Sequence, residues 1–105
     1  MTKQEAKDLS LRKWRYLEAN TNVGDPEDIG DIELLNELKH CRNFCPLCQL
    51  FYVCSSCFGC PLDDAGGFCF ERSSLFFRWC YAITDVERSE AAGRIIKTIE
   101  AWRPE

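Results

Sequence analysis

Hydrophobic residues recur at helical spacing near the end of the chain. The apolar positions, three or four residues apart, are Ala92, Ile95, Ile96, Ile99 and Trp102. This spacing places them on one side of a helix. Thr84, followed three residues later by Glu87, has the pattern of a capping box at the start of that helix. We therefore predict a final amphipathic helix whose apolar side lies in the core.

A more hydrophobic segment precedes this helix. Ser73 or Ser74 can cap a helix there. Its large apolar residues are Phe76, Phe77, Trp79, Cys80 and Ile83. Because they cover nearly the whole circumference, we predict that this helix is the most buried element of the protein.

The first forty residues predict two further helices. Glu5 to Ala19 reads as a helix with a broad apolar face that includes Leu11 and Trp14. The polar segment Asn20 to Asp25 is rich in turn residues. Asp25 and Pro26 then predict the cap and first position of a second helix that continues to His40. Its apolar positions are Ile32, Leu35 and Leu38.

No helical or strand period continues for long between Cys41 and Cys69. Gln49 to Val53 could form a short strand or an arm, and Asp63 to Gly67 a loop. The predicted fold class is mainly α, a small single domain (1–105) of about four helices around an irregular, cysteine-rich zinc-knuckle centre. Its parts are the N-terminal helices (1–40), the metal-binding centre (41–72) and a C-terminal helical hairpin (73–105).

Eight cysteines lie in the 105-residue chain, all between Cys41 and Cys80. Residues Met1 to Trp14 contain no continuous apolar run of a secretory signal, and no segment is long and apolar enough to span a membrane. We therefore expect a cytoplasmic protein, in the host cytoplasm if it is viral. Thiols persist in a reducing compartment, which favours metal binding over disulfides, although disulfides stay an alternative.

The spacing of the cysteines predicts a zinc site. Cys45 and Cys48 form one C-x2-C pair, and Cys57 and Cys60 form another. Two tight turns of this kind bring four thiolates to one zinc ion. Cys69 could replace one of the four. Bound zinc would stabilise a domain that has little room for a core.

The other cysteines leave the number of metal ions open. Cys41, Cys54 and Cys80 could join Cys69 in a second zinc site, while Cys80, inside an apolar helix, is more simply a buried thiol. His40 is the one histidine, and we expect it to be solvated or packed rather than to bind metal.

The cysteine pattern allows three other interpretations. Cys54, Cys57 and Cys60, followed by Pro61, resemble half of an iron-sulfur cluster motif, which makes a cluster the alternative cofactor. Cys45 and Cys48 could be a redox dithiol, but the strand and long helix expected around such a motif are not evident. The C-x3-C-x2-C string that begins at Cys41 matches radical SAM enzymes, but the chain is too short for their partial barrel.

Charge is unevenly distributed along the chain. The net charge is −4, and Glu18 to Glu37 hold seven acidic residues and no Lys or Arg. Such a block is typical of a solvated surface, or of one that docks on a basic partner. The acidic pI of about 5.0 disfavours nucleic-acid binding. If nucleic acid does bind, the predicted contacts are Arg12, Lys13, Arg15 and Arg42.

The chain resembles a group of small, cysteine-rich, uncharacterised proteins of bacteriophages and prokaryotes. The resemblance rests on Lys13-Trp14, on Cys45-Pro-Leu-Cys48, on Cys57-Phe-Gly-Cys60-Pro61, on Cys69, and on the aromatic segment ending in Phe77 and Trp79. It implies a metal-binding role for Cys45, Cys48, Cys57, Cys60 and Cys69. Cys41, Cys54 and Cys80 depart from the pattern.

The predicted function is that of a zinc-stabilised protein-interaction module rather than an enzyme. A single histidine and an abundance of thiolates favour a closed structural site over a catalytic one. The expected partner is a protein. The resemblance implies that the protein is encoded by a phage, and that it could inhibit a defence or regulatory protein of the host. A homodimer, a metal-dependent nucleic-acid-binding protein and a small iron-sulfur protein stay as alternatives.

Overall fold

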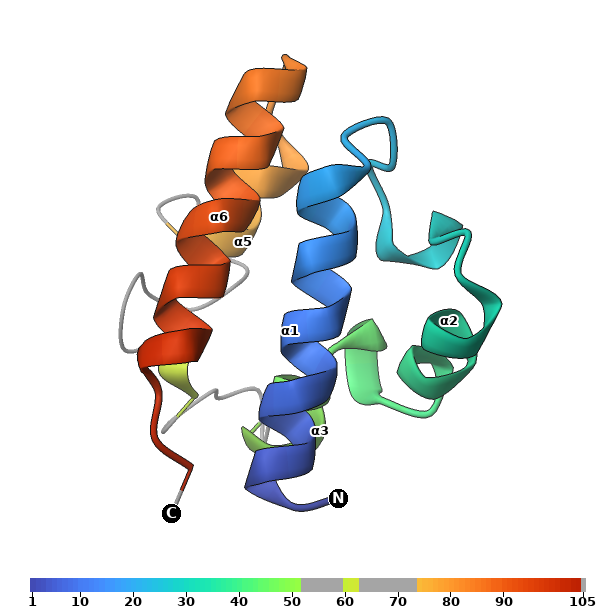
Figure 1. The fold of residues 1–105 in the computed structure, drawn as a ribbon, viewed down its shortest axis with the longest axis vertical. Helices are drawn as coiled ribbons and strands as arrows, with labels where there is room; N and C mark the ends of the chain where they lie inside the picture. The colour runs from blue at the N-terminus through green and yellow to red at the C-terminus, as the bar shows by residue number, and fades with distance from the viewer. Residues whose placement is uncertain (52–59, 63–73, 105) are drawn as a thin grey trace.

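The computed structural model describes residues 1–51, 60–62 and 74–104 (Figure 1). The described residues contain no strand and five α-helices, of which only three have eight residues or more. The helices are α1 (Lys3–Ala19), α2 (Ile32–Lys39), α3 (Pro46–Phe51), α5 (Leu75–Cys80) and α6 (Asp85–Ala101), and the two 3-10 helices are η1 (Pro26–Asp28) and η2 (Arg42–Phe44). The mainly α fold class is therefore confirmed. None of the described helices is both long and apolar enough to cross a membrane.

Helices α1 and α6 run antiparallel and pack against each other along their length (Figure 1). Leu17 of α1 and Ile95 and Ile99 of α6 are completely buried at this contact. Lys7 of α1 donates hydrogen bonds to the carbonyl oxygens of Glu100 (3.1 Å) and Trp102 (2.6 Å) at the C-terminus of α6. A lysine is favourable there because the last carbonyls of a helix carry partial negative charge.

The sequence prediction for α6 is confirmed. Ala92, Ile95, Ile96 and Ile99 are buried, and Trp102 is half-buried with its ring centroid 5.8 Å from that of Phe51. Thr84 caps the helix because its hydroxyl accepts a hydrogen bond from the backbone N–H of Glu87 (3.1 Å). The reciprocal bond differs from a standard capping box, because the Glu87 carboxylate accepts from the N–H of Ile83 (3.1 Å), one residue before the cap.

The second predicted helix is divided in two. Asp25 caps only the short helix η1, where its carboxylate accepts from the N–H of Glu27 (2.9 Å). A second aspartate, Asp31, caps α2 by accepting from the N–H of Leu34 (3.1 Å). The prediction of one continuous helix from Asp25 was therefore wrong. A second capping aspartate, preceded by glycine, offers the chain a new helix start.

This later start also changes the buried side of α2. Leu34 and Leu38 are buried, Leu35 is half-buried, and Ile32 is exposed at the first helical position. His40 ends the helix and is exposed, in agreement with the prediction of a solvated histidine.

Ser74 caps α5, as predicted, by accepting from the N–H of Phe77 (3.0 Å). The expectation that α5 would be the most buried element was wrong. The helix ends at Cys80, so Ile83 lies beyond it and is 89% exposed, and Cys80 is exposed rather than buried. Within α5, Trp79 alone is fully buried, with its ring against that of Trp14 at a centroid distance of 5.2 Å. A helix of only six residues packs one side against the rest of the protein, so the residues on its other sides stay partly or fully exposed.

The segment after Cys45 is helical where the sequence suggested a strand or an arm. Gln49, Leu50 and Phe51 belong to α3, which packs against α1. Tyr52, Val53 and the predicted loop Asp63 to Gly67 lie outside the described residues.

Candidate metal centre

Three of the five predicted ligands lie in the described part of the chain. Cys45 directly precedes α3, and Cys48 lies in its first turn. Cys60 is buried. Cys57 and Cys69 lie outside the described residues, as does Cys54. None of the described cysteines forms a disulfide bond.

The C-x2-C pair is arranged by the start of α3 rather than by an isolated turn. Pro46 occupies the first helical position, which suits its fixed φ angle. The backbone N–H groups of Leu47 and Cys48 then point back and donate to the sulfur of Cys45. This is the same arrangement by which an N-cap side chain satisfies the first N–H groups of a helix.

A turn with unusual backbone angles leads into Cys45. Asn43 and Phe44 both have φ in the left-handed region, at 57° and 53°. Asparagine adopts this conformation readily, whereas a bulky residue such as phenylalanine rarely does. Two contacts from outside the turn help to hold it. The Phe44 carbonyl accepts from Lys13 Nζ of α1 (2.9 Å), and the Arg42 N–H donates to the Gln49 side-chain oxygen of α3 (3.0 Å).

The environment of Cys45 favours a thiolate. Its pKa is lowered from the ordinary value of 9.0 to about 5, and the largest cause is a hydrogen bond from the Cys48 thiol. The nearby Lys13 ammonium and the N–H groups of Cys48 and Leu47 lower the pKa further, and together they outweigh the opposing effect of burial. The thiolate is the form of cysteine that binds metal ions and acts as a nucleophile.

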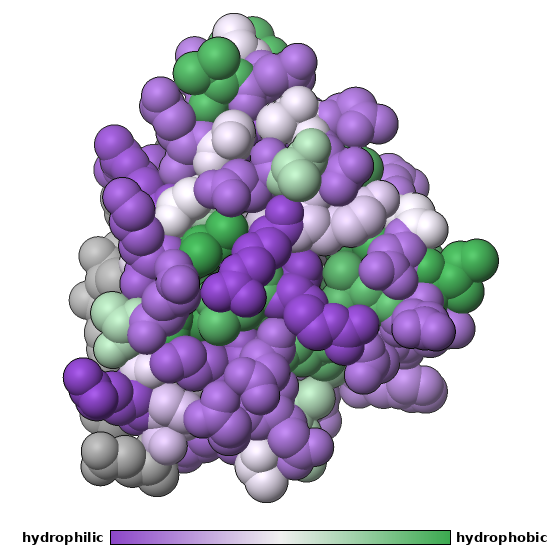
Figure 2. All heavy atoms as spheres, in the orientation of Figure 1, coloured by the Kyte–Doolittle hydropathy of each residue, from purple (hydrophilic) through white to green (hydrophobic). Residues whose placement is uncertain are grey.

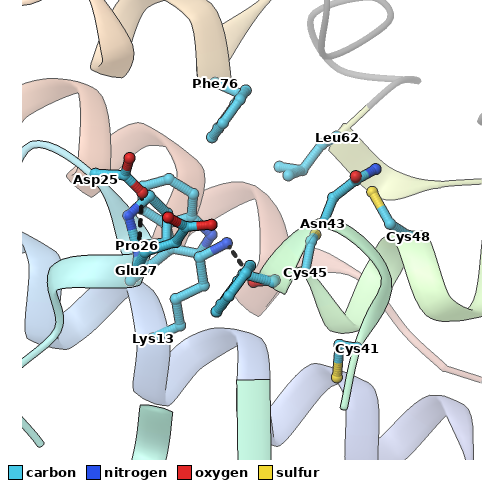
Figure 3. Close-up of a pocket in the computed structure, with 12 residues that line it drawn as sticks. Lys13, Asp25, Pro26, Glu27, Cys41, Asn43, Cys45, Cys48, Leu62 and Phe76 are labelled. Atoms are coloured by element: carbon cyan, nitrogen blue, oxygen red, sulfur yellow. Dashed lines mark hydrogen bonds between the residues drawn. The ribbon is translucent and has the colours of Figure 1, made fainter. Parts of the chain in front are cut away.

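Cys41 lies near this pair but has a different environment. Burial raises its pKa, and the Cys45 charge raises it further. Its Sγ is 3.6 Å from the Glu37 carbonyl oxygen, and in Figure 3 it is directed away from Cys48. Within residues 1–51, 60–62 and 74–104, no three histidine, cysteine or acidic side chains are close enough together to hold a metal ion. The described residues therefore bring Cys45 and Cys48 together but do not form a metal site with three or more ligands by themselves.

The cysteine pair opens onto a pocket of about 420 Å³ (Figure 3). Its apolar wall is formed by Trp14, Pro26, Phe44, Leu62 and Phe76. Its polar lining includes Lys13, Asp25 and Glu27, together with Cys41, Cys45 and Cys48. Space therefore exists beside Cys45 and Cys48 for an ion or a small group.

Among the residues that it describes, the structure shows only one of the two elements expected around a redox dithiol, a helix after the first cysteine but no strand before it. Cys45 and Cys48 do begin a helix, but α3 has six residues, and the described part of the chain shows no strand before it. Cys80, one of the cysteines that could form a second site, is in α5 at the surface, although burial of its thiol raises its pKa.

The sequence-based prediction of Lys13 as an exposed nucleic-acid contact, beside Arg12, Arg15 and Arg42, does not agree with the structure. Lys13 is only 1% exposed, and its side chain lines the pocket. The spacing of residues in α1 already indicated that Lys13 is buried. Lys13 falls on the buried stripe of α1 with Ala6, Leu9 and Leu17, at steps of three or four residues. A charged residue on an apolar stripe indicates a specific buried partner.

Comparisons of the chain with models of protein families, with curated proteins and with solved structures found no match.

Proposed function

We propose that this chain is a zinc-stabilised protein-interaction module of the cytoplasm. In this proposal Cys45 and Cys48 bind one zinc ion together with two of the three cysteines Cys57, Cys60 and Cys69, which completes the tetrahedral thiolate site of a zinc-knuckle centre. The observation that carries the proposal is the position of Cys45 and Cys48 at the start of α3, where both line a pocket with room for an ion. The environment of Cys45, which favours its thiolate, supports this assignment. A closed site of this kind contributes to folding rather than to catalysis.

The scaffold of α1 and α6 does not need this ion for its own packing, because its contact is a continuous apolar core. The segment between α3 and α5 is different. It holds Cys54, Cys57, Cys60 and Cys69 among glycine, proline and serine, so its sequence offers few periodic apolar positions for a core. The zinc ion would join this segment to α3.

Exposed apolar side chains support the interaction role. Tyr81, Ile83 and Val86 are large and mostly exposed around the turn between α5 and α6. Figure 2 shows hydrophobic surface at the end of the molecule where α6 begins. Exposed apolar groups that gather on a surface are a feature of proteins that bind other proteins. Under the resemblance to phage proteins, the partner would be a host protein, and inhibition of a defence or regulatory protein would be the role.

Nucleic-acid binding is less well supported by the described residues. Arg12 forms an ion pair with Glu37 (2.5 Å), and Arg15 with Glu100 (3.5 Å). With Lys13 buried, the four proposed cations do not form an open basic patch. Such binding would show itself as a steep loss of affinity with added salt.

Cobalt(II) titration tests the zinc site. Tetrahedral cobalt bound by thiolates gives charge-transfer bands that report sulfur ligands, and added zinc removes them because it binds such sites more tightly. We expect wild-type protein to bind one cobalt ion in this way, Cys45→Ser to lose most of the bands, and the surface control Cys80→Ser to keep them. Wild-type protein without thiolate bands would refute the proposal. A visible colour in protein purified without oxygen would instead indicate an iron-sulfur cluster.

A further inference from the structure

Helix α1 carries a lysine on its buried side. Lys13 is 1% exposed, on the same stripe as the buried residues Ala6, Leu9 and Leu17. An ammonium group loses strongly favourable hydration when it is buried, so it needs hydrogen bonds and a nearby negative charge. The identity of that negative charge indicates what Lys13 does.

The contacts of Lys13 in the described residues are mainly with neutral groups. Its Nζ donates to the Phe44 carbonyl oxygen (2.9 Å) and lies 4.9 Å from the centre of the Trp14 ring. Both contacts stabilise a cation, but neither carries a full negative charge. The two ion pairs in the described part of the chain, Arg12 with Glu37 and Arg15 with Glu100, do not include Lys13.

The Lys13 side chain lines the same pocket as Cys41, Cys45 and Cys48 (Figure 3). Its hydrogen-bond acceptor, the carbonyl oxygen of Phe44, belongs to the residue directly before Cys45. A thiolate at Cys45 would therefore place a negative charge at the pocket that holds the Lys13 ammonium, and this ammonium in turn helps to lower the pKa of Cys45. Asp25 and Glu27 line the same pocket, but neither forms an ion pair with Lys13 among the described residues.

We propose that Lys13 is a positioning residue of the metal centre: its ammonium balances part of the negative charge of the metal-bound thiolates, and its bond to Phe44 fixes the turn that presents Cys45. This inference rests on the proposed zinc site. Four thiolates around Zn²⁺ carry a net charge of −2, which is unfavourable in a partly buried site unless a cation lies nearby. Through its bond to Phe44, Lys13 also connects the turn before Cys45 to helix α1.

The chain offers a matched control for this role. Lys7 lies on the same helix and also donates its Nζ to backbone carbonyls, but its partners are Glu100 and Trp102 at the end of α6. Lys7→Met therefore removes a lysine and its carbonyl bonds from the scaffold without removing charge from the cysteines. Lys13→Met removes both the bond to Phe44 and the charge beside Cys45.

The experiment measures the zinc affinity of each variant by competition with a coloured chelator, and the pH at which half of the zinc is released. We expect Lys13→Met to weaken zinc binding about 10- to 100-fold, the usual effect of losing a group that supports metal ligands. We also expect it to release zinc at a higher pH, because protons compete better for thiolates that have lost a neighbouring cation. Lys7→Met should lower the melting temperature and leave both zinc measurements close to wild type.

Each outcome decides a different claim. Equal zinc affinity and release pH in wild type and Lys13→Met would overturn the role of Lys13, as would equal losses in Lys13→Met and Lys7→Met, since the effect would then be general destabilisation. If Lys13→Met does not fold, Lys13→Gln decides the matter because glutamine keeps a hydrogen-bond donor without the charge, and unchanged zinc binding in it would overturn the charge role. A wild-type protein that binds no zinc would instead refute the proposed function.

Discussion

Two isoleucines in the C-terminal part of the chain provide a direct test of the fold. Ile95 lies in the contact between α6 and α1 and is completely buried, whereas Ile83 precedes α6 and is 89% exposed. The sequence predicts a buried position for both, Ile83 in a helix that is apolar nearly all round and Ile95 on the apolar side of the final amphipathic helix. Truncating each to alanine removes the same atoms, so the difference between the two variants reports mainly burial, less the small gain in helix propensity that alanine brings at Ile95.

The expected magnitudes follow from the surroundings of each side chain. Removing a buried isoleucine side chain costs about 2–5 kcal/mol of unfolding free energy, and Ile95→Val should cost about 0.5–1.5 kcal/mol. Ile83→Ala should stay within about 0.5 kcal/mol, because surface changes away from special contacts have little effect. For a domain of this size, 1 kcal/mol corresponds to about 4–5 °C in melting temperature.

Thermal unfolding followed by circular dichroism at 222 nm, with zinc held at one fixed concentration, measures these differences. Zinc is held constant because a ligand that binds only the folded state shifts the melting temperature. We expect Ile95→Ala to melt roughly 10–20 °C below wild type, with Ile95→Val between them, and Ile83→Ala to melt within about 2 °C of it. If Ile83→Ala were as destabilising as Ile95→Ala, the assignment of Ile83 to the surface, and with it the end of α5 at Cys80, would be wrong.

Three further predictions concern α6 and the cysteine pair. Gly93→Ala should raise the unfolding free energy, measured by urea unfolding, by up to about 1 kcal/mol, because alanine favours the helix more than glycine does. The added Cβ would meet one atom, Oε2 of Glu18 at 2.9 Å, which is the end of a flexible side chain and can move. A loss of stability would show that this contact is rigid. Thr84→Ala should lower it by about 1 kcal/mol through loss of the helix cap, whereas Thr84→Ser should be close to neutral. The lowered pKa of Cys45 means that its thiolate contribution to stability is fully present above pH 9, the unfolded value, and is lost as the pH falls through about 5. A titration of the metal-free protein followed by thiolate absorbance that gave Cys45 an ordinary pKa would contradict this environment.

The sequence predicted the two long helices because their periodic patterns extend over many residues. In α6, four isoleucine and alanine positions agree with one another, so a single ambiguous residue changes little. The shorter elements lack this redundancy. The start of α2 depended on which of two aspartates caps the helix. For α5, the apolar composition did not reveal that a helix of only six residues buries just one of its side chains.

The pairing of Cys45 with Cys48 was predictable from the sequence, but the surroundings of the pair were not. The C-x2-C spacing pointed to these two residues, because two sulfurs three residues apart can face one ion. It could not reveal that α3 begins between them, nor that Phe44 adopts a left-handed conformation whose carbonyl meets Lys13. These features depend on contacts between segments about thirty residues apart in the sequence, which a local pattern does not contain.

Native mass spectrometry of freshly purified protein, before and after incubation with a strong chelator, tests the central proposal most directly. The mass shift identifies the metal and its stoichiometry in one measurement. We predict wild-type protein with bound zinc, and loss of ordered structure in the cysteine-rich centre when zinc is removed. A metal-free native protein whose fold and stability are unchanged by the chelator would contradict the account.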